Sequence, residues 1–427
     1  MNSFSSFLRK FEKENNLRLF MPGHQGKCSF LNKNISAVFD LTEIKGADSL
    51  YNSKGIIKNL EDFISKIYCS NSYISAGGST LCIQTILWIL KNKKFIASRG
   101  AHMSFYNAAA LFGIHTTFIG NHRTVRLKEI KNAFLKVGKG AVLFLTSPNY
   151  YGEVLDIKNI RQICDLFEAT LVVDAAHGAH LRFLNKNLHP IFLGADFCCC
   201  SFHKTLPALT GASILFVREG ILDKDKVKKT MALFGSSSPS YLIIDSIGLC
   251  ADWLQKHAKR EFSKLNNKKQ KLISALNLKF LKTDPTKLVL DCFEIKGGVL
   301  AAVSKLRKFK IVPEFYNNRF ICLILSPFLK DEDWVRVKNC LKELKLTKKS
   351  KYFVEEKLNF KKACGLKTAM FKKKEYVNVK HCLNRVFADN IFSQIPGVLL
   401  LAYGEILTEK FVKILKEKGI EKVRVLK

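Results

Sequence analysis

This 427-residue sequence lacks a membrane-spanning run, a signal peptide and the composition of a disordered protein. Each absence excludes a class of protein. No apolar run approaches the roughly 20 residues that a membrane-spanning helix needs. Residues 1–27 are polar and contain no apolar core of a signal peptide. Because 47% of the residues are hydrophobic, the composition gives no reason to expect disorder. We therefore expect a globular protein of two domains that stays in the cytoplasm.

Acidic residues are scarce. The chain has 36 Asp and Glu against 70 Lys and Arg, which gives a formal net charge of +34. Such a charge can indicate nucleic acid, an anionic surface or acidic substrates as partners. The lysines are spread along most of the chain, however, and no aromatic-basic motif of a nucleic-acid-binding module is present. We attribute the charge to a lysine-biased proteome and expect neither nucleic acid nor a membrane as a partner, while a polyphosphate partner stays open.

The 13 cysteines include no Cys-x-x-Cys pair. Cys198, Cys199 and Cys200 are consecutive, so they alternate faces along a strand and cannot all converge on one ion. We interpret the cysteines as small buried hydrophobes in a reducing cytosol, and we expect no metal site.

What the sequence does contain is an apolar run that ends in reactive groups. Residues 198–209 read CCCSFHKTLPAL, which is typical of a buried strand that delivers polar side chains to its exit. Lys204 is the candidate nucleophile, because an unprotonated amine can form a Schiff base with an aldehyde cofactor. A closed pocket beside His203 would lower the pKa of this amine by desolvation. Most lysines are surface charges, so this interpretation depends on a second segment.

That segment is residues 170–180, TLVVDAAHGAH. Its apolar residues predict a buried strand that ends on Asp174, at the sheet edge where open α/β folds bind ligands. An Asp at this edge can hold a pyridine nitrogen protonated, which makes the ring an electron sink. Alone, such an Asp is more often a helix cap. Paired with Lys204, it indicates pyridoxal phosphate.

The two segments resemble the ornithine/lysine/arginine decarboxylase family, a branch of the aspartate aminotransferase-like (fold type I) enzymes. That family shows a Ser-x-His-Lys-Thr-Leu-Pro-Ala motif, which is intact at residues 201–208. It also shows Asp-Glu-Ala-His-Gly, which is present at residues 174–178 with Ala175 in place of Glu. The resemblance implies pyridoxal 5'-phosphate as cofactor and an α/β fold with a mostly parallel sheet flanked by helices. It also implies decarboxylation of arginine, lysine or ornithine to carbon dioxide and a polyamine or its precursor.

A phosphate site is expected at residues 77–80, GGST, just before an apolar helical stretch. Backbone N–H groups and the positive end of a helix dipole attract anions there. An ordinary N-cap at Ser79 or Thr80 explains the same residues equally well. The position of this segment relative to the other motifs favours phosphate, with Gly78, Ser79, Thr80 and Ser201 as its ligands.

The resemblance also implies roles for individual residues. Residues 99–104 match the family's Arg-Asn-x-His-Lys-Ser segment with departures at Gly100 and Met103, and His102 is then the residue that stacks on the pyridoxal ring. Residues 146–152 are similar to Thr-Ser-Pro-Thr-Tyr-x-Gly, so Thr146 faces the cofactor. The expected catalytic residues are Lys204, His203, Asp174 and His102, with His203 or Lys204 returning a proton to the α-carbon. Ala176, on the other face of the ring, and His177 complete the cofactor contacts.

A homodimer or larger homo-oligomer with shared active sites is also implied. Residues 234–241 look like the family's loop that reaches the phosphate of the partner subunit, so Ser237 or Ser238 would act only in a dimer. Residues 19–27 and 40–50 resemble amino-terminal segments that approach an active site, often that of the neighbour. Near the carboxyl end, Pro396, Gly397, Gly404 and Glu405 match a further family motif.

Alternating strands and helices predict parallel pairing with right-handed crossovers. We expect an amino-terminal segment over residues 1–50, beginning with a helix over residues 4–16. A large cofactor-binding domain should span residues 51–270, and a smaller α+β domain residues 271–427.

Two alternatives stay open. Another pyridoxal reaction, transamination or a lyase reaction, would use the same Lys204 and Asp174. The second alternative is a regulatory relative of a decarboxylase that has lost turnover. The departures from the family motifs at Ala175 and Gly100 favour it, and the retained Lys204 opposes it. The identity of the basic substrate also stays open, because its distal cation needs an acidic partner that the sequence does not locate.

Overall fold

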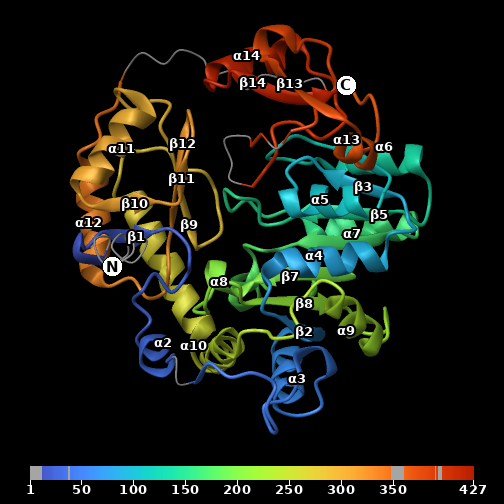
Figure 1. Ribbon diagram of the computed structural model, residues 1–427. Helices are drawn as coiled ribbons and strands as arrows, with labels where there is room; N and C mark the ends of the chain where they lie inside the picture. Colours follow the sequence, from blue (N-terminus) through green and yellow to red (C-terminus); the bar gives the residue numbers. More distant parts are fainter. Residues whose placement is uncertain (1–11, 37–38, 348–359, 390, 393–396) are drawn as a thin grey trace, which may run out of the picture.

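The computed structural model describes residues 12–36, 39–347, 360–389, 391–392 and 397–427 (Figure 1). Its centre is a seven-stranded sheet in the order β2-β8-β7-β6-β5-β3-β4. The strands are β2 (Asn71–Ser75), β3 (Phe95–Ser98), β4 (Thr116–Ile119), β5 (Val142–Thr146), β6 (Thr170–Asp174), β7 (Phe197–Ser201) and β8 (Ser213–Val217).

Most of the sheet is parallel, as expected. Strands β4, β3, β5, β6 and β7 pair in parallel, and α5 (Met103–Leu111), α6 (Leu127–Val137) and α7 (Ile157–Leu166) lie in the connections. Strand β8 is antiparallel to both of its neighbours. A parallel return needs a crossover of about a dozen residues or more. The connection between β7 and β8 is residues 202–212, with only the short helix α8 (Phe202–Thr205), so the chain turns back directly.

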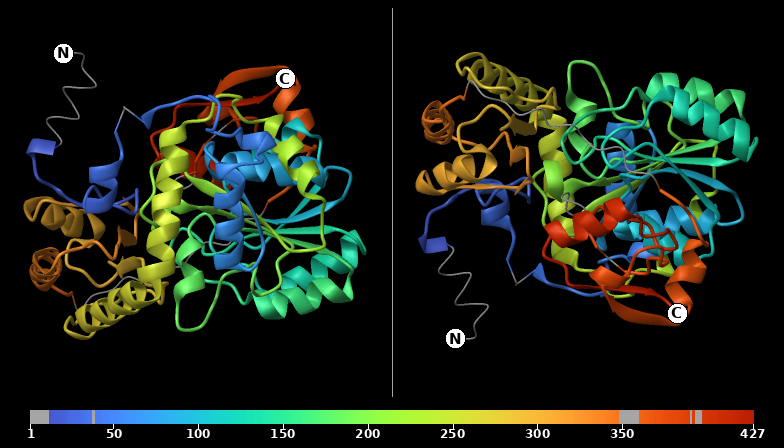
Figure 2. Two further views of the ribbon diagram at one scale, coloured as in Figure 1. Left: turned by 90° about the horizontal axis from the view of Figure 1, so that it is seen from below. Right: turned by 90° about the horizontal axis from the view of Figure 1, so that it is seen from above.

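Helices cover both faces of this sheet (Figure 2). On one face Phe144, Val172 and Cys199 form a core with α4 (Gly78–Ile89), α5 and α9 (Lys224–Ala232). On the other face Cys198 and Cys200 join a core with α3 (Ile56–Tyr68), α6, α7 and α10 (Tyr241–Ser274). Because both faces are buried, β5, β7 and β8 have side chains buried at every position, which explains their continuous apolar sequences.

The long helix α10 runs between the central sheet and a smaller α+β unit (Figure 2). This unit contains the antiparallel sheet β11-β12-β9, with β9 (Lys287–Asp291), β11 (Phe315–Tyr316) and β12 (Phe320–Ile324). Helices α11 (Gly298–Lys308) and α12 (Asp331–Lys342) belong to it. The amino-terminal strand β1 (Leu17–Leu19) joins it by pairing in parallel with β10 (Ile311–Pro313).

A third group of elements lies at the carboxyl end. The antiparallel pair β13 (Lys374–Asn378) and β14 (Lys422–Leu426) packs with α14 (Glu409–Glu417) around its own apolar cluster. Helix α13 (Leu366–Phe371) contacts α5 of the large sheet. The remaining short helices are α2 (Ser29–Asn34), η2 (Leu50–Asn52), η3 (Ala179–Phe183) and η4 (Val379–His381).

The α/β architecture with a mostly parallel sheet is confirmed. The domain boundaries at residues 50 and 270 stay a prediction, and residue 270 falls inside α10. The helix expected over residues 4–16 lies mostly outside the described residues, as does Pro396. Among the described helices, none is long and apolar enough to cross a membrane.

Candidate active site

Lys204 and Asp174 lie at the carboxyl ends of two adjacent strands. Asp174 is the last residue of β6 and stands in register with Cys199 of β7. Lys204 follows β7 within α8. The Asp174 side chain is buried, and its Oδ1 accepts a hydrogen bond from the Ala176 N–H at 3.0 Å. The parallel pairing of β6 and β7 therefore delivers the amine and the carboxylate to the same sheet edge.

The Lys204 amine has two ring neighbours. Its Nζ lies 3.4 Å from His177 Nε2 and 5.9 Å from the centre of the Tyr150 ring. Burial lowers the pKa of the Lys204 amine, and the cation of Lys287 lowers it further, whereas Asp174 and Glu314 oppose this shift. A lowered pKa increases the unprotonated fraction, which is the nucleophilic form of an amine.

Two histidines beside Lys204 are held neutral. Burial, followed by the charge of Lys204, lowers the pKa of His177 well below its ordinary value. Burial also lowers the pKa of His203 to about 4. His203 Nδ1 lies 3.0 Å from the Ala212 carbonyl oxygen, to which a neutral ring donates its proton. His177 can therefore accept a hydrogen bond from the amine, and His203 Nε2 carries no proton at neutral pH.

His102 caps the amino end of α5. Its Nδ1 accepts a hydrogen bond from the Ser104 N–H at 3.2 Å, which assigns the proton of the neutral ring to Nε2. Burial lowers the pKa of His102, the charge of Lys204 lowers it further, and Asp174 opposes the shift. Gly397 packs against the ring edge, because a Cβ at this position would lie 2.5 Å from His102 Nε2.

A group of small polar residues lies at the other end of the site. Ser79 Oγ and Ser201 Oγ are 2.7 Å apart and join α4 to β7. Gly78 begins α4 with φ of +69°, and no atom lies within 4 Å of the place where its Cβ would be. Thr80 is exposed on the first turn of the same helix. This arrangement is open space at a helix amino terminus, bordered by hydroxyl groups, which suits a phosphate.

The family model described as Orn/Lys/Arg decarboxylase, major domain, matches residues 3–298. The chain belongs to the Orn/Lys/Arg decarboxylase family. The family resemblance that the sequence motifs suggested is thereby confirmed.

Several known proteins are similar to this family member along most of their length. The arginine decarboxylase of Bacillus subtilis (strain 168) is 25% identical over 445 residues, covering 94% of this chain and 90% of that protein. The constitutive lysine decarboxylase of E. coli matches with a TM-score of 0.74 and 16% identity, covering 100% of this chain and 82% of that chain. Lysine decarboxylase A from Pseudomonas aeruginosa gives a TM-score of 0.76 and 14% identity, covering 96% and 81% of the two chains. The structural likeness establishes the fold of pyridoxal-phosphate-dependent decarboxylases and transferases.

The family and the fold imply pyridoxal phosphate, and the described residues fit it. Among them, no donor reaches Asp174 Oδ2, so this oxygen is available for a pyridine nitrogen. Thr146 stands in register with Asp174, and its buried Oγ1 has no hydrogen-bond partner among the described residues. The open space beside Gly78 can hold a phosphate. These three features lie along one sheet edge, as a ring with a phosphate arm requires.

The departures from the family motifs leave this arrangement in place. The Ala175 side chain is fully buried in the apolar core. A Cβ on Gly100 would lie 2.7 Å from the His122 carbonyl oxygen, so the backbone here excludes a larger residue. Met103, the first residue of α5, is partly buried against the core on that face of the sheet.

Some expected site residues are not brought to Lys204 within one chain. Ser237 and Ser238 are exposed on the loop between α9 and α10. Their contact with a partner's phosphate stays a prediction. Ala176 is buried two residues after Asp174, and its place under the ring stays a prediction.

The sequence motifs missed three residues of the site. Tyr150 lies within the motif at residues 146–152, four residues after the end of β5, so it could have been included. Its ring centre is 5.0 Å from that of His177. Glu314 and Lys287 come from the smaller unit. The charge of Glu314 raises the pKa of the Lys204 amine, and the charge of Lys287 lowers it. Nothing in the sequence pattern signals either of them.

A separate buried cluster lies on the opposite face of β7. The possible ligand atoms of His189, Cys198 and Cys200 all lie within 4.8 Å of one another, and His189 Nε2 is 3.3 Å from Cys200 Sγ. Burial raises the pKa of the Cys200 thiol and lowers the pKa of His189 to about 3. A neutral thiol that donates to a neutral imidazole accounts for this contact without an ion. The expectation of no metal site stays a prediction.

Proposed function

We propose that this protein is a pyridoxal-phosphate-dependent decarboxylase of a basic amino acid, either arginine, lysine or ornithine. The observation that carries the proposal is the position of Asp174 at the end of β6 and of Lys204 just after the adjacent parallel strand β7. The relatives named above as arginine or lysine decarboxylases support this reaction class. The expected product is an amine of the polyamine type, formed in the cytoplasm.

The chemistry that pyridoxal phosphate supplies when bound is an electron sink for the electron pair left as the α-carboxylate departs. Lys204 would hold the cofactor through its amine. Asp174 would place a negative charge at the pyridine nitrogen. The remaining contacts would come from His102, Ala176, His177, Thr146, Gly78, Ser79, Thr80 and Ser201 in the chain itself, and from Ser237 and Ser238 of a second copy.

Lys204 is a better candidate than His203 for returning a proton to the α-carbon. The pKa of His203 is lowered to about 4 by burial, and its Nδ1 faces the Ala212 carbonyl. Its Nε2 is therefore a bare acceptor at neutral pH. The Lys204 amine can give a proton once it has taken one up as an ammonium, its lowered pKa makes that ammonium a stronger acid, and it lies among the groups at the sheet edge.

Glu314 supports a substrate with a distal cation. It is only partly buried, and its Oε2 accepts a hydrogen bond from the Met21 N–H at 2.9 Å. Its charge raises the pKa of both Lys204 and Tyr150. A carboxylate at this place offers an ion pair to the ammonium or guanidinium of a basic amino acid.

A second copy of this chain is the partner that the exposed surface favours. Phe39, Leu41 and Ile56 are 52%, 44% and 59% exposed beside a groove that Tyr241 and Ile244 of α10 also line. The loop with Ser237 and Ser238 leads directly into this part of α10. Burial of the groove by a second subunit would thus bring that loop toward the partner, as shared active sites require.

The test is product analysis. Purified protein with pyridoxal phosphate is incubated separately with L-arginine, L-lysine and L-ornithine, and carbon dioxide and the amine product are measured. We expect release with one of the three. Lys204→Ala should abolish the release and the absorbance of the lysine-bound cofactor, whereas the exposed Lys186→Ala should change neither.

Other products would assign other functions. A keto acid without carbon dioxide would indicate transamination. Cofactor binding without turnover of any basic amino acid would indicate a regulatory relative and contradict the proposed reaction.

A further inference from the structure

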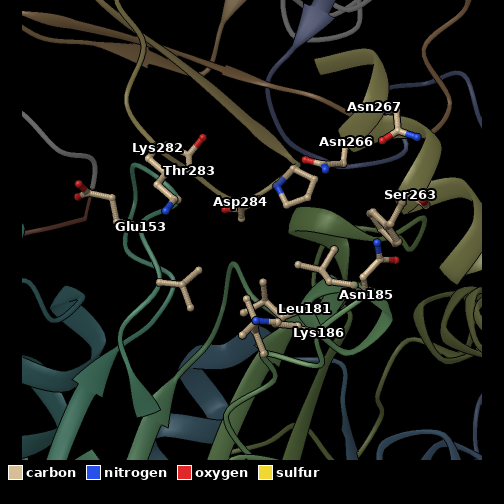
Figure 3. Close-up of a pocket in the computed structure, with 16 residues that line it drawn as sticks. Glu153, Leu181, Asn185, Lys186, Ser263, Asn266, Asn267, Lys282, Thr283 and Asp284 are labelled. Atoms are coloured by element: carbon tan, nitrogen blue, oxygen red, sulfur yellow. The ribbon is translucent and has the colours of Figure 1, made fainter. Parts of the chain in front are cut away.

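Two parts of the chain pack against the large sheet in different places. The smaller unit meets it around a cavity of about 560 Å³, which Glu153, Asn266 and residues 282–285 help to line (Figure 3). Among the described residues, none after residue 285 lines this cavity. The described residues from 360 onward, here called the carboxyl-terminal group, meet the sheet elsewhere, beside His102.

The carboxyl-terminal group touches His102 directly. Val398 forms an antiparallel bridge with His102, and the Met103 N–H donates to the Gly397 carbonyl oxygen at 2.7 Å. A Cβ on Gly397 would lie 2.5 Å from the His102 ring and 3.3 Å from the Tyr150 hydroxyl oxygen. Residues 397 and 398 therefore pack against two rings of the candidate site.

A buried ion pair joins the same carboxyl-terminal segment to the loop that carries His102. Arg99 Nη2 donates to Glu405 Oε1 at 2.7 Å, and Nη1 donates to Oε2 at 3.2 Å. The two side chains are only 11% and 4% exposed. Arg99 directly follows β3 and lies three residues before His102. A bidentate pair of this kind fixes the relative orientation of its two segments as well as their distance.

Both members of the pair have further contacts. Glu405 Oε2 also accepts a hydrogen bond from the Ala402 N–H at 3.0 Å, and the Glu405 carbonyl oxygen accepts one from the Phe387 N–H at 2.8 Å. The Arg99 guanidinium carbon lies 3.4 Å from the centre of the Phe360 ring. Glu405 is thus bound within the carboxyl-terminal group, and the Arg99 side chain reaches into that group.

The backbone around Arg99 is fixed to the large sheet. The Arg99 N–H donates to the Ile119 carbonyl at 3.1 Å, and the Arg99 carbonyl accepts a hydrogen bond from the Tyr106 hydroxyl at 3.0 Å. Tyr106 lies on α5, the helix whose amino end His102 caps. Residues 99–102 are therefore held at both ends, by the ion pair and by the cap of α5.

We propose that Arg99 and Glu405 are positioning residues of this site: their ion pair holds residues 397 and 398 against His102 and thereby sets the orientation of its imidazole. The inference rests on the proposed function in one respect, namely that His102 packs on the cofactor ring. It gives the carboxyl-terminal group a part in a site otherwise built on the large sheet and the smaller unit.

The test measures the His102 ring in protein free of cofactor. Diethyl pyrocarbonate acylates the unprotonated nitrogen of a neutral imidazole, which in His102 is Nδ1, covered by the N–H and the hydroxyl of Ser104. The rate of acylation therefore reports how often the ring leaves its place. Modified peptides are quantified by mass spectrometry, and the exposed His115 in the same sample calibrates the reagent.

Glu405→Gln keeps the shape of the side chain and removes its charge. We expect the acylation rate of His102 to rise about tenfold, because the local opening loses one hydrogen bond between charged groups. Arg99→Met, which keeps an unbranched stem, should give a similar rise. The double variant should give no larger rise than either single variant, because the two residues act as a pair.

Asp196→Asn is the matched control. Asp196 forms a similarly buried pair with Arg161, in which Arg161 Nη1 lies 3.0 Å from Asp196 Oδ2 and the side chains are 13% and 5% exposed. Asp196 directly precedes β7, at the opposite end of that strand from Lys204. This variant removes a buried carboxylate charge far from His102, so we expect the acylation rate of His102 to stay unchanged.

The buried His189, on the opposite face of β7, separates positioning from general loosening of the fold. If the pair only stabilises the fold, Glu405→Gln raises the rates of His102 and His189 together, and this result would overturn the proposal. An unchanged rate at His102, or an equal rise in Asp196→Asn, would overturn it as well.

Should Glu405→Gln fail to fold, Glu405→Asp, whose shorter carboxylate cannot reach both guanidinium nitrogens in the same way, makes the same comparison. Failure of both variants to fold would assign the pair to stability alone and also reject the proposal. Because the labelling needs neither cofactor nor turnover, its outcome is separate from that of the decarboxylation assay.

Discussion

Lys204 Nζ lies 3.4 Å from His177 Nε2, and burial lowers the pKa of both groups. Two bases at this distance cannot both carry a proton without repulsion, so the neutral imidazole serves as an acceptor for the amine. The Tyr150 ring packs on the same imidazole. The orientation of the amine therefore depends on a histidine of the neighbouring strand's loop.

Replacing His177 tests this acceptor role. His177→Phe keeps a ring against Tyr150 but removes the acceptor, and we expect the turnover number to fall about 2- to 10-fold, the cost of one hydrogen bond between neutral groups. His177→Gln, which retains an acceptor, should lose less. Steady-state rates of carbon dioxide release measure the difference. Equal losses in the two variants would contradict a hydrogen-bonding role.

Gly397→Ala should disturb His102. The new Cβ would lie 2.5 Å from the ring, and the backbone φ of +73° adds strain. We expect a loss of about 1–3 kcal/mol in the free energy of unfolding, with reduced turnover. Gly419→Ala is the control, because its φ is +69° but no atom lies within 4 Å of its Cβ position. Chemical denaturation and the rate assay should separate the clash from the backbone strain alone.

The free energy of unfolding should fall with acid in a defined window. Burial lowers the pKa of His189 to about 3, whereas in the unfolded chain this pKa returns to about 6.5. The unfolded state therefore binds more protons below about pH 6.5, and the stabilisation present above that pH is lost toward pH 3. We expect a loss on the order of 2–3 kcal/mol from this residue between pH 7 and pH 4 in urea denaturation.

His189→Phe is the control for that window. It keeps the ring contacts with Tyr68 and Phe216 and removes the titrating group. The dependence of unfolding on pH should be shallower in this variant. The same slope as in the wild type would show that His189 is not held neutral in the folded state.

Shared active sites can be tested by mixing two inactive variants. Lys204→Ala removes the amine, and the double variant Ser237→Asp with Ser238→Asp puts charge on the loop expected to reach a partner's phosphate. If sites are shared, one intact site forms in each heterodimer. Co-expression should then restore about a quarter of the wild-type activity, since half of the dimers are mixed and each has one of two sites. No recovery, with heterodimers demonstrated by affinity tags, would place both serines outside the partner's site.

The pairing of Lys204 with Asp174 was predictable because each follows an apolar strand, and the ends of parallel strands share an edge. The antiparallel direction of β8 could not be predicted, because it depends on how short the connection is that contains α8. Ser237 and Ser238 depend on a second subunit. Features of this kind can be predicted only from the folded assembly, because no local sequence pattern specifies them.

Glu314 and Lys287 could not be predicted for a different reason. Both belong to the smaller unit, more than 80 residues after Lys204, and stand near it only because α10 folds that unit against the sheet. A charged residue at the start of a strand has no local pattern that marks it as buried. Tyr150, by contrast, lies within the recognisable segment at residues 146–152, just after a strand end, so local sequence was sufficient to predict it.

The pairing of β1 with β10 matches Leu17 with Ile311, so the first strand of the chain has its partner almost three hundred residues away. During synthesis the ribosome must deliver the smaller unit before that strand can dock, whereas the central sheet can already assemble. Strand β1 is thus synthesised long before its partner, and it cannot form its native pairing with β10 until translation has passed residue 313.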